Sequence, residues 1–504
     1  MKPGKIWGIT TGSHDASICV VDQSRTGSLE IDFAAHAERS SRVKNDKNLN
    51  KTVIEQALEF GEPTEIIHYE NDLLKRTRQL WAGQYDTMWN KPSIKQQLKK
   101  VYPQLNTRIQ YARHHHSHAA GGYYTSQFTD ATVLVIDSIG EWETLTIWNA
   151  EGRNMKRVYS QQFPNSLGIW YSAMTQRLGL KPNEDEYILM GWAALGDPDK
   201  YKMKIWNDFF KTETMSPSNA HIKMQANLHR GCKDWAPELN SIQDYADIAA
   251  GVQAVYEYVF THLVNWCKTN TPSNNLVVMG GCALNCVANS IAKKYYKDVW
   301  IMPNPGDAGS SLGSILAVKQ RHIHFNSPYL GYNIAGKYPV NSALKELKTN
   351  RLVGVANGRA EFGPRALGNR SLFADPRGKD VKDLVNTVKR RQEFRPFAPV
   401  ILEEHAHNYF DGPTGPYMQF TSVCKDPEQF PAIAHLDNTS RVQTVNQFQH
   451  PMLHELLTRW YADTGCPMIL NTSLNIKGEP MVDTEVDAKR WQDTYNVRVL
   501  TQDE

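Results

Sequence analysis

The 504-residue sequence predicts a two-domain α/β protein whose first domain is built by duplication. This length exceeds what one hydrophobic core usually supports, so at least two domains are expected. Two strand patterns within residues 5–21 flank a turn-rich segment, and the same strand–loop–strand pattern recurs at 131–148. Two such hairpins far apart in the chain indicate a duplicated architecture. Residues 322–350 lack clear periodicity, so we place the domain boundary there and divide the chain into 1–345 and 346–504.

Composition and charge are those of an ordinary globular protein. Hydrophobic residues make up 41% of the chain and charged residues 22%, and the net charge of +3 argues neither for nor against a polyanionic partner. No apolar run reaches the length of a membrane span, and the polar segment 1–5 lacks a signal-peptide core. The seven cysteines follow no framework spacing. We therefore expect reduced thiols in a cytoplasmic protein with no membrane partner.

A glycine pair follows the third strand pattern of the first domain. The strand is predicted at 275–279 and runs into Gly280 and Gly281, followed by a helix-like segment at 283–294. Small residues there allow a ligand to approach the backbone closely, and Asn285 adds an amide suited to adenine or ribose. The alternative is an ordinary glycine pair at a strand end.

A histidine-rich segment carries the clearest chemical signal. His114 and His118 are four residues apart, which on a helix places both imidazoles on one face, where they can hold one metal ion. Asp137 and Asp307 are the candidate carboxylate ligands, because each ends a strand or lies in a loop of the first domain, where functional side chains concentrate. The alternatives are a solvated helix start and, for Asp137 in its predicted loop at 137–141, an ordinary turn aspartate.

His14 and Asp15 occupy the tip of the first hairpin. A histidine there can accept a proton from a substrate hydroxyl, because its pKa lies near the working pH. An exposed turn histidine without function is the alternative.

The second domain, which restarts with a strand pattern at 351–355, contains a basic cluster. Residues 359–395 hold ten basic and five acidic side chains, a local net charge of +5. Several of the arginines lie among glycines and prolines, and arginine in fixed loops suits bidentate capture of phosphate. Further along, residues 471–475 offer hydroxyl and amide groups after a strand-like 468–470. A surface charge run and a polar turn are the alternatives.

These motifs together resemble the NodU/CmcH family of O-carbamoyltransferases, which includes the tobramycin carbamoyltransferase. In chain order the motifs are His14-Asp15, Glu38-Arg39, His114-x-x-x-His118, Ser166-Leu-Gly168, Glu186 with Met190-Gly191, Gly280-Gly-Cys-Ala-Leu-Asn285, Gly306-Asp-Ala-Gly309, Glu361 to Arg370, Arg395-Pro-Phe-Ala-Pro399, Arg441-Val-Gln-Thr444 and Asn471-Thr-Ser473. So many motifs in the right order leave little room for chance.

The resemblance implies two domains with separate chemistry. Residues 1–345 are expected to form an actin/Hsp70-like (TsaD-like) duplicated ATPase-type domain with a metal site, and residues 346–504 a YrdC-like α/β domain. In the family, carbamoyl phosphate and ATP form carbamoyl-adenylate in the YrdC-like domain. The intermediate then moves to the metal-containing site, where an acceptor hydroxyl attacks the carbamoyl carbon and AMP leaves.

The resemblance also implies roles for the candidate residues. The metal ligands are His114, His118, Asp307 and Asp137, the last either directly or through water. Fe(II) is implied by the resemblance, and the ligand types are compatible with Zn(II) or Mn(II) as well. The catalytic residues are His14, as general base, and Asp15, and the adenosine is expected against Gly280, Gly281 and Asn285. The residues expected to bind carbamoyl phosphate and Mg-ATP are Arg365, Arg370, Lys389, Arg391, Arg395, Arg441, Asn471, Ser473 and Asn475.

The sequence departs from the family at one position. Ile188 stands where the family usually has a lysine before the Met190-Gly191 motif. If that lysine contacts a phosphate or an acceptor in relatives, this protein lacks the contact, and the acceptor is therefore the least constrained part of the prediction.

One segment favours a nucleic-acid acceptor. Residues 71–108 carry eight basic and two acidic side chains, with four aromatic residues interleaved, and precede the histidine motif directly. Basic groups that follow phosphates and aromatic rings that stack on bases are typical of single-strand or flipped-base surfaces. We therefore favour a 5-hydroxymethyl-pyrimidine, in DNA or as a nucleotide, as phage-encoded relatives linked to hypermodified bases also suggest. An amphipathic helical pair with a solvated basic face is the alternative for this segment.

Other functions remain open from the sequence. A sugar hydroxyl of an antibiotic or other metabolite is the alternative acceptor, and tRNA threonylcarbamoylation, which would consume threonine and bicarbonate, is an alternative reaction. A non-catalytic nucleotide-binding module would need no histidine pair. Hydrogenase-maturation carbamoylation would require zinc-finger cysteine pairs and an acylphosphatase domain, neither of which is evident. The oligomeric state is open, a homodimer included.

Overall fold

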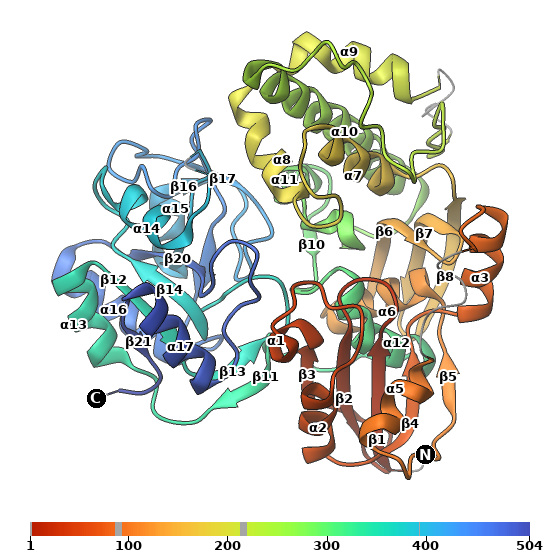
Figure 1. The fold of residues 1–504 in the computed structure, drawn as a ribbon, viewed down its shortest axis with the longest axis horizontal. Coiled ribbons are helices and arrows are strands. Elements are labelled where there is room, and N and C mark those ends of the chain that lie inside the picture. Colours follow the sequence, from red (N-terminus) through yellow and green to blue (C-terminus); the bar gives the residue numbers. More distant parts are fainter. Residues whose placement is uncertain (1–2, 86–92, 212–218, 393, 504) are drawn as a thin grey trace. The chain divides into compact units, whose positions relative to one another are not determined.

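The computed structural model describes residues 3–85, 93–211, 219–392 and 394–503, which divide into two compact units (Figure 1). Unit 1 comprises residues 1–30 and 61–324, and unit 2 comprises 31–60 and 325–504. The structure thus differs from the expected division at residue 345 in two respects. The chain passes into the second unit about twenty residues earlier, and an N-terminal segment also belongs to that unit.

Two five-stranded sheets form the framework of unit 1 (Figure 1). The first has the order β3-β2-β1-β4-β5 and the second β8-β7-β6-β9-β10. β1 pairs antiparallel with β2 and parallel with β4, and β6 in the same way pairs antiparallel with β7 and parallel with β9. The strands are β1 (Gly4–Thr10), β2 (Ser17–Gln23), β3 (Leu29–His36), β4 (Pro63–His68), β5 (Ile109–Tyr111), β6 (Asp130–Gly140), β7 (Glu143–Glu151), β8 (Asn154–Gln162), β9 (Asn275–Met279) and β10 (Asp298–Trp300). The repeated strand order confirms the duplication predicted from the two hairpins.

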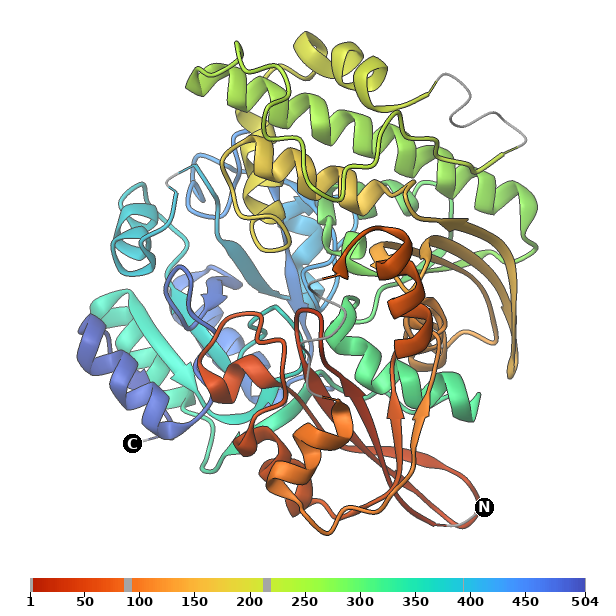
Figure 2. The same cartoon turned by 45° about the vertical axis from the view of Figure 1, so that its right-hand side comes forward.

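Two central helices connect the halves of unit 1. Helix α6 (His114–Thr125) follows the first set of strands but packs against β6, β7 and β9, whereas α12 (Ser310–Lys319) follows the second set and packs against β1, β2 and β4. The two helices contact each other, and Figure 2 shows both in the middle of this unit. Their approach requires small residues, because a Cβ on Gly313 would lie 2.1 Å from the carbonyl oxygen of Ser117. The starts of α6 and α12 are thereby fixed close together.

The remaining helices of unit 1 surround these sheets. They are α3 (Asp72–Trp81), α5 (Ile94–Val101), α7 (Leu167–Arg177), α8 (Glu186–Trp192), η1 (Ala193–Leu195), α9 (Pro198–Phe209), α10 (Ile242–Asn270), η2 (Gly281–Leu284), α11 (Cys286–Ala292) and η3 (Asp307–Gly309). Although α10 has 29 residues, no helix in the described parts of the chain is both long and apolar enough to cross a membrane.

Unit 2 is built on a mixed six-stranded sheet with the order β19-β15-β20-β14-β12-β21. Alternate residues of its strands face two cores, as the period of two of a strand requires. Val353 and Val355 pack with α13 and α16, while Leu352 and Ala356 pack with α14 and α17. Helices therefore cover both faces of the sheet, and the whole chain has the mixed α/β fold that the sequence predicts.

The elements of unit 2 follow in chain order. They are α1 (Ala37–Ser41), α2 (Lys51–Glu59), β11 (Tyr329–Ile334), α13 (Val340–Asn350), β12 (Leu352–Ala356), β13 (Gly358–Glu361), β14 (Arg370–Ala374), α14 (Val381–Lys389), β15 (Ala398–Leu402), η4 (Glu403–His405), α15 (Ala406–Tyr409), β16 (Phe410–Asp411), β17 (Ser422–Cys424), β18 (Thr439–Ser440), β19 (Gln443–Val445), α16 (Pro451–Thr464), β20 (Met468–Ser473), α17 (Glu485–Tyr495) and β21 (Val499–Leu500).

Two local predictions were wrong. The expected loop 137–141 is largely the end of β6, whose pairing with β7 shifts register between Ile136 and Gly140. A bulge of this kind keeps the strand going while it re-aims side chains. The region 322–350 contains helix α13, whose buried positions Val340, Ala343 and Leu347 have helical spacing and were hidden by the polar residues between them.

Candidate metal centre and basic pocket

The start of α6 presents two imidazoles to one point. His114 and His118 lie one turn apart on the helix, and their Nε2 atoms are 3.2 Å from each other. Both side chains are almost fully buried. The helical placement that the spacing predicts is therefore observed.

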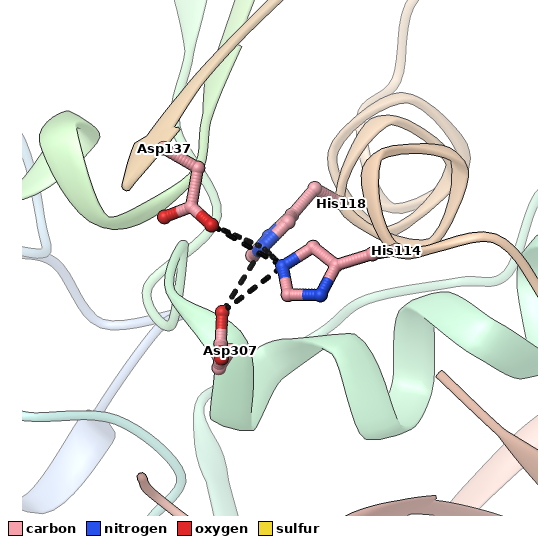
Figure 3. A group of neighbouring side chains, drawn as sticks. All are labelled: His114, His118, Asp137 and Asp307. Carbon is pink, nitrogen blue, oxygen red and sulfur yellow. Dashed lines mark hydrogen bonds and ion pairs between the residues drawn. The ribbon is translucent and has the colours of Figure 1, made fainter. Parts of the chain in front are cut away.

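Two carboxylates from distant parts of unit 1 complete the group (Figure 3). His114 Nε2 lies 3.2 Å from Asp137 Oδ2 and 3.3 Å from Asp307 Oδ1. His118 Nε2 lies 3.3 Å from Asp307 Oδ1 and 3.9 Å from Asp137 Oδ2. Asp137 comes from the irregular end of β6 and Asp307 from η3, just before α12, so the duplicated framework brings the four predicted residues together.

Each of these side chains is held from behind by a second partner. His118 Nδ1 lies 3.2 Å from Ser310 Oγ, and His114 Nδ1 lies 3.5 Å from Glu70 Oε2. Asp137 Oδ1 accepts a hydrogen bond of 3.0 Å from the backbone N–H of Gly281. A carboxylate on His114 Nδ1 favours a proton there and leaves the Nε2 lone pair directed at the cluster.

The donor set and its spacing fit a divalent cation. Two imidazole nitrogens and two carboxylate oxygens lie within 4.8 Å of one another. A tetrahedral ion with bonds of about 2.1 Å would separate its ligand atoms by roughly 3.4 Å, close to most of the separations seen here. The four atoms carry lone pairs directed at one point, and hydrogen bonds cannot satisfy all of them at once. A bound metal ion would stabilise this arrangement.

The electrostatics of the cluster reflect its carboxylates. Burial lowers the pKa of His114, but Asp307, Asp137 and Glu70 outweigh it and raise that pKa well above the usual value. Burial likewise opposes ionisation of Asp307, yet the histidines hold its pKa well below the usual range. His114 and the carboxylates of the cluster therefore stabilise each other's charged forms.

His14 lies beside the cluster, as predicted, with Nδ1 2.9 Å from Asp15 Oδ2. Burial lowers the pKa of His14, but the hydrogen bond with Asp15 and the negative charge of Asp307 and Asp137 raise it to about 10. The imidazole is therefore protonated at neutral pH unless a cation offsets those carboxylates. His115 points away, with Nδ1 3.0 Å from Thr146 Oγ1.

The predicted adenosine residues have different local roles. Gly280 adopts a φ of +91°, and a Cβ there would lie 2.2 Å from the carbonyl oxygen of Ile136, so only glycine fits. Asn285 caps α11 by accepting from the backbone N–H of Ala288, and its Nδ2 donates to Gln253 Oε1 at 3.0 Å. Asn285 thus caps α11, and its contact with adenosine stays a prediction.

In unit 2, three predicted residues converge on one ammonium group. Lys389 Nζ donates to the carbonyl oxygens of Ser473 at 2.5 Å and Asn475 at 2.6 Å, and to Asn475 Oδ1 at 2.7 Å. Lys389 is buried at the end of α14, and β20 supplies Ser473. These residues, far apart in sequence, therefore form one site.

Further cations surround this lysine. Burial lowers the pKa of Lys389 well below its usual value, and the positive charges of Arg391, Arg395 and Lys44 lower it further. Arg391 donates to the carbonyl oxygen of Pro396 at 2.6 Å, and its guanidinium lies 3.6 Å from the centre of the Phe397 ring. The negative charge of Glu479 opposes this shift. Guanidinium and ammonium groups gathered in this way attract anions, so this basic cluster suits a phosphate-containing ligand.

Arg370 requires a correction. Its side chain is fully buried, and all three guanidinium nitrogens donate to backbone carbonyl oxygens. The acceptors are Asp483, Asn357, Gly358, Asn369 and Tyr332. A guanidinium committed in this way joins segments of unit 2 and is not available to bind a phosphate.

The other predicted residues of unit 2 are placed as follows. Asn471 donates to Gln443 Oε1 at 2.7 Å, while its Oδ1 is buried without a hydrogen-bond partner among the described residues. The Nε of Arg441 is also buried without such a partner in the described parts of the chain. Arg365 is partly exposed in the segment between β13 and β14.

Sequence reasoning missed two residues of these sites. Glu70, which supports His114, is a single carboxylate directly after β4 and matches no motif. Lys44 belongs to the N-terminal segment that joins unit 2, and only the family motif Glu38-Arg39 could have pointed to that segment.

The basic segment 71–108 is only partly described. It forms the amphipathic helices α3 and α5, as the alternative interpretation predicts, with Trp81 and Tyr85 largely exposed. Trp89 and Lys91 lie outside the described residues. The departure from the family, Ile188, is buried in α8, so no charged group stands there.

Comparison with protein families decides the class of the protein. The family domain "Carbamoyltransferase N-terminus" matches residues 75–316, and "Carbamoyltransferase C-terminus" matches residues 344–504. The chain belongs to the carbamoyltransferase family. It is therefore a carbamoyltransferase, and the N-terminal match contains the four residues of the candidate metal centre.

Relatives match this carbamoyltransferase over different shares of their length. An uncharacterized protein of Synechocystis sp. is 31% identical, over 96% of this chain and 93% of its own. Nodulation protein NolO of Bradyrhizobium diazoefficiens is 30% identical, over 74% of this chain and 75% of its own. Nodulation protein U of Sinorhizobium fredii is 34% identical, over 44% of this chain and 43% of its own.

Among solved structures, full-length HypF in its phosphate- and nucleotide-bound form aligns with 63% of this carbamoyltransferase. The sequences are 12% identical and the TM-score is 0.36. The chain spans 46% of the HypF chain. A likeness of this degree supports no functional inference.

Proposed function

We infer that this carbamoyltransferase is an ATP-dependent O-carbamoyltransferase that makes carbamoyl-adenylate in unit 2 and transfers the carbamoyl group in unit 1. The convergence of His114, His118, Asp137 and Asp307 carries the proposal. A protein that only binds nucleotides would need no such buried group. The TsaD-like character of unit 1 and the YrdC-like character of unit 2 are part of this proposal.

The basic cluster around Lys389 in unit 2 suits the first half-reaction. Hydrolysis of carbamoyl phosphate yields carbamate and phosphate, and a carbamate oxygen then attacks the α-phosphate of ATP while pyrophosphate leaves. Both substrates carry several negative charges, so their approach requires fixed positive charge. Arg391, Arg395 and Lys44 would supply it around Lys389, which is itself positioned by Ser473 and Asn475.

The cluster of unit 1 suits the second half-reaction. His14 is the candidate base for the acceptor hydroxyl, whose oxygen attacks the carbamoyl carbon as the bond to AMP breaks. When bound by His114, His118, Asp137 and Asp307, a divalent cation would offset the charge that develops on AMP and the carboxylate charge that raises the pKa of His14. Fe(II), Zn(II) and Mn(II) are compatible with these ligands. The Gly280-Gly281 turn contacts Asp137, so an adenylate bound at this turn would lie beside the cluster.

A 5-hydroxymethyl-pyrimidine, free or in DNA, is the acceptor we propose. The basic and aromatic side chains of α3 support it, because such surfaces bind single strands and flipped bases. Ile188 is buried where the family usually has a lysine, so this protein lacks any acceptor contact that such a lysine would make. A sugar hydroxyl of a metabolite is the second candidate.

The proposal is tested by product mass. The protein, loaded with each of the three metals in turn, is incubated with ATP, carbamoyl phosphate and an oligonucleotide containing 5-hydroxymethylcytosine, and the nucleosides are then weighed by mass spectrometry. We expect a carbamoyl adduct with wild type and with His116→Gln, whose imidazole stacks on Trp148 away from the cluster, and none with His118→Ala. No adduct on any hydroxymethylated base, free or in DNA, would exclude the acceptor.

The rival reaction is tested in the same assay. Threonine and bicarbonate replace carbamoyl phosphate, and tRNA replaces the oligonucleotide. Threonylcarbamoyl-adenosine in the digest would overturn the proposal.

A further inference from the structure

A cavity in unit 1 leads away from the candidate metal centre. Its volume is about 260 Å³, and its lining includes His114, Asp137 and Asp307 at one end. Those three side chains are buried, whereas His229 and Arg230, which also line the cavity, are exposed. The cavity therefore runs from the cluster to the surface. Its size, near the lower end of the roughly 300–1,000 Å³ of ligand pockets, suits a moiety of nucleotide size rather than an oligosaccharide.

The outer part of the cavity is positively charged. Glu70 forms an ion pair with Lys75, and the other two lining carboxylates belong to the cluster. Arg78 donates only to neutral acceptors in the described parts of the chain, the carbonyl oxygen of Glu141 at 2.9 Å and Gln84 Oε1 at 3.2 Å. Arg230 forms no ion pair with any described residue. The charge of Glu70 also acts on Arg78, so the cation of the cavity without an acidic partner among the described lining residues is Arg230.

Three basic side chains of the cavity lie near one another, the exposed His229 and Arg230 and the buried Arg78. Arg78, His229 and Arg230 all line the cavity. Burial lowers the pKa of His229, and the positive charges of Arg78 and Arg230 lower it further, which places these groups within electrostatic reach of one another. Like charges held together in a cavity wall are stabilised by an anion, and guanidinium groups suit phosphate in particular.

Aromatic rings lie directly beside these cations. The guanidinium of Arg78 lies 5.9 Å from the centre of the Phe163 ring, and His229 meets the same ring edge-on at 5.9 Å. Trp81 contacts both Phe163 and Trp142, and 62% of its own surface is exposed. A nucleobase next to a bound phosphate would find a stacking surface here.

The cavity wall also offers an unused acceptor. Gln176 lines the cavity, and its Oε1 is buried without a hydrogen-bond partner among the described residues. Gly231, with φ of +84°, leaves this oxygen in place, because a Cβ there would lie 1.7 Å from it. A bound molecule with an N–H or O–H group can satisfy Gln176.

We propose that Arg78, His229 and Arg230 form a phosphate subsite, so that the acceptor of this carbamoyltransferase is a phosphate ester whose hydroxyl reaches the cluster from the same cavity. The proposal rests on the proposed carbamoyl transfer and deepens it. A phosphate next to the acceptor is supplied either by a free nucleotide or by a DNA strand. Both share the chemistry that the subsite recognises, and the test distinguishes them.

The test compares three acceptors with the same base. They are 5-hydroxymethyl-2′-deoxycytidine, its 5′-monophosphate, and a short single-stranded oligonucleotide with one such base. We expect the KM of the nucleoside to exceed that of the monophosphate at least tenfold, and Arg230→Gln to remove most of that difference. Lys233→Gln changes an exposed lysine nearby that does not line the cavity and should leave every KM unchanged.

The outcomes separate the subsite from its alternatives. A lower KM for the oligonucleotide than for the monophosphate identifies DNA as the source of the phosphate, and the reverse identifies the nucleotide. Equal KM values for nucleoside and monophosphate overturn the proposal. The proposal is also overturned if Arg230→Gln loses transfer to the nucleoside as strongly as transfer to the monophosphate. The cations would then act on the adenylate and not on the acceptor phosphate.

A binding experiment keeps the subsite testable without turnover. Calorimetry measures thymidine and thymidine monophosphate, neither of which carries the acceptor hydroxymethyl group. Tighter binding of the monophosphate that Arg230→Gln abolishes supports the subsite even if no hydroxymethylated base is carbamoylated, an outcome that would exclude only the proposed acceptor. Monophosphate binding that Arg230→Gln leaves unchanged overturns it.

Discussion

The two units gather opposite kinds of side chain in their interiors. Unit 1 brings imidazole and carboxylate lone pairs to one point, whereas unit 2 brings ammonium and guanidinium groups around Lys389. A cation would complete the first arrangement and an anion the second. In the proposed reaction, each unit would thus perform one of the two half-reactions. The difference predicts that each site can be disabled without the other.

The largest expected effect comes from uncoupling the two half-reactions. His114→Ala removes a cluster side chain, so carbamoyl transfer should fall by about 1,000-fold or more while pyrophosphate release from ATP continues. Arg395→Gln should instead slow pyrophosphate release about 100-fold. Both are measured with a coupled phosphate assay and mass spectrometry of the product. Full transfer activity in His114→Ala would show that unit 1 works by another mechanism.

The second prediction distinguishes two kinds of cation within unit 2. The cations around Lys389 are proposed to bind a ligand, whereas Arg370 stabilises the fold. Arg370→Met leaves several buried carbonyl oxygens unpaired, so we expect a loss of about 4 kcal/mol in the free energy of unfolding. Urea denaturation followed by tryptophan fluorescence measures it, with the exposed Lys379→Met as control. A stable Arg370→Met protein that has lost only affinity for carbamoyl phosphate would restore the ligand-binding role.

The third prediction concerns His450 in unit 2. Its imidazole is buried against neutral groups, whereas His114 in unit 1 is buried among carboxylates. His450 Nδ1 accepts from the N–H of Leu453 and Nε2 lies 2.9 Å from Asn369 Oδ1, so the neutral imidazole is fixed. Burial lowers the pKa of His450 to about 4. The unfolded chain, with a pKa near 6.5, binds this proton first, so unit 2 should lose roughly 3 kcal/mol of stability as pH falls from about 6.5 to 4.

His450→Asn tests this origin, because asparagine can still cap α16 but does not titrate. The variant should flatten the pH dependence of the free energy of unfolding, measured by urea denaturation at each pH. The exposed His407→Asn should not. An unchanged pH dependence in His450→Asn would assign the loss to other groups.

The smallest effect is expected at Glu70, which contacts the metal cluster of unit 1 through His114. Glu70→Gln keeps an acceptor near His114 Nδ1 but removes its charge, so we expect metal affinity to fall about 10- to 100-fold. Chelator competition with Zn(II) measures it. Glu65→Gln, at the partly exposed ion pair with Lys319, serves as the matched control. Equal affinities in wild type and Glu70→Gln would leave Glu70 a purely structural partner of Lys75.

How far the sequence predicts this molecule differs between residues. His114 and His118 are predictable because one helix fixes their relation, and the strands at 5–21 and 131–148 reveal the duplication by their own periodicity. The carboxylates Asp137 and Asp307 required the additional signal of their position after strands. What joins them is the packing of α6 on α12, which no local pattern contains.

The assignment of Arg370 is wrong for a physical reason. Its side chain suits a ligand, but the guanidinium is used on backbone carbonyl oxygens that only the folded chain brings near. Glu70 and Lys44 show the converse, because each gains its role from residues distant in sequence. Residue type predicts the chemistry available, and tertiary structure decides where it is used.

The excursion of residues 31–60 has a consequence for biosynthesis. Arg42 of this segment donates to the carbonyl oxygens of Met481 and Pro480, residues that leave the ribosome more than four hundred positions later. The last residue of unit 1 is translated about 150 residues before Pro480 and Met481. Residues 31–60 therefore lack these partners during the synthesis of unit 1. A gene cut at codon 325 would therefore separate unit 2 from part of itself, and its two fragments should regain a native unit 2 only when expressed together.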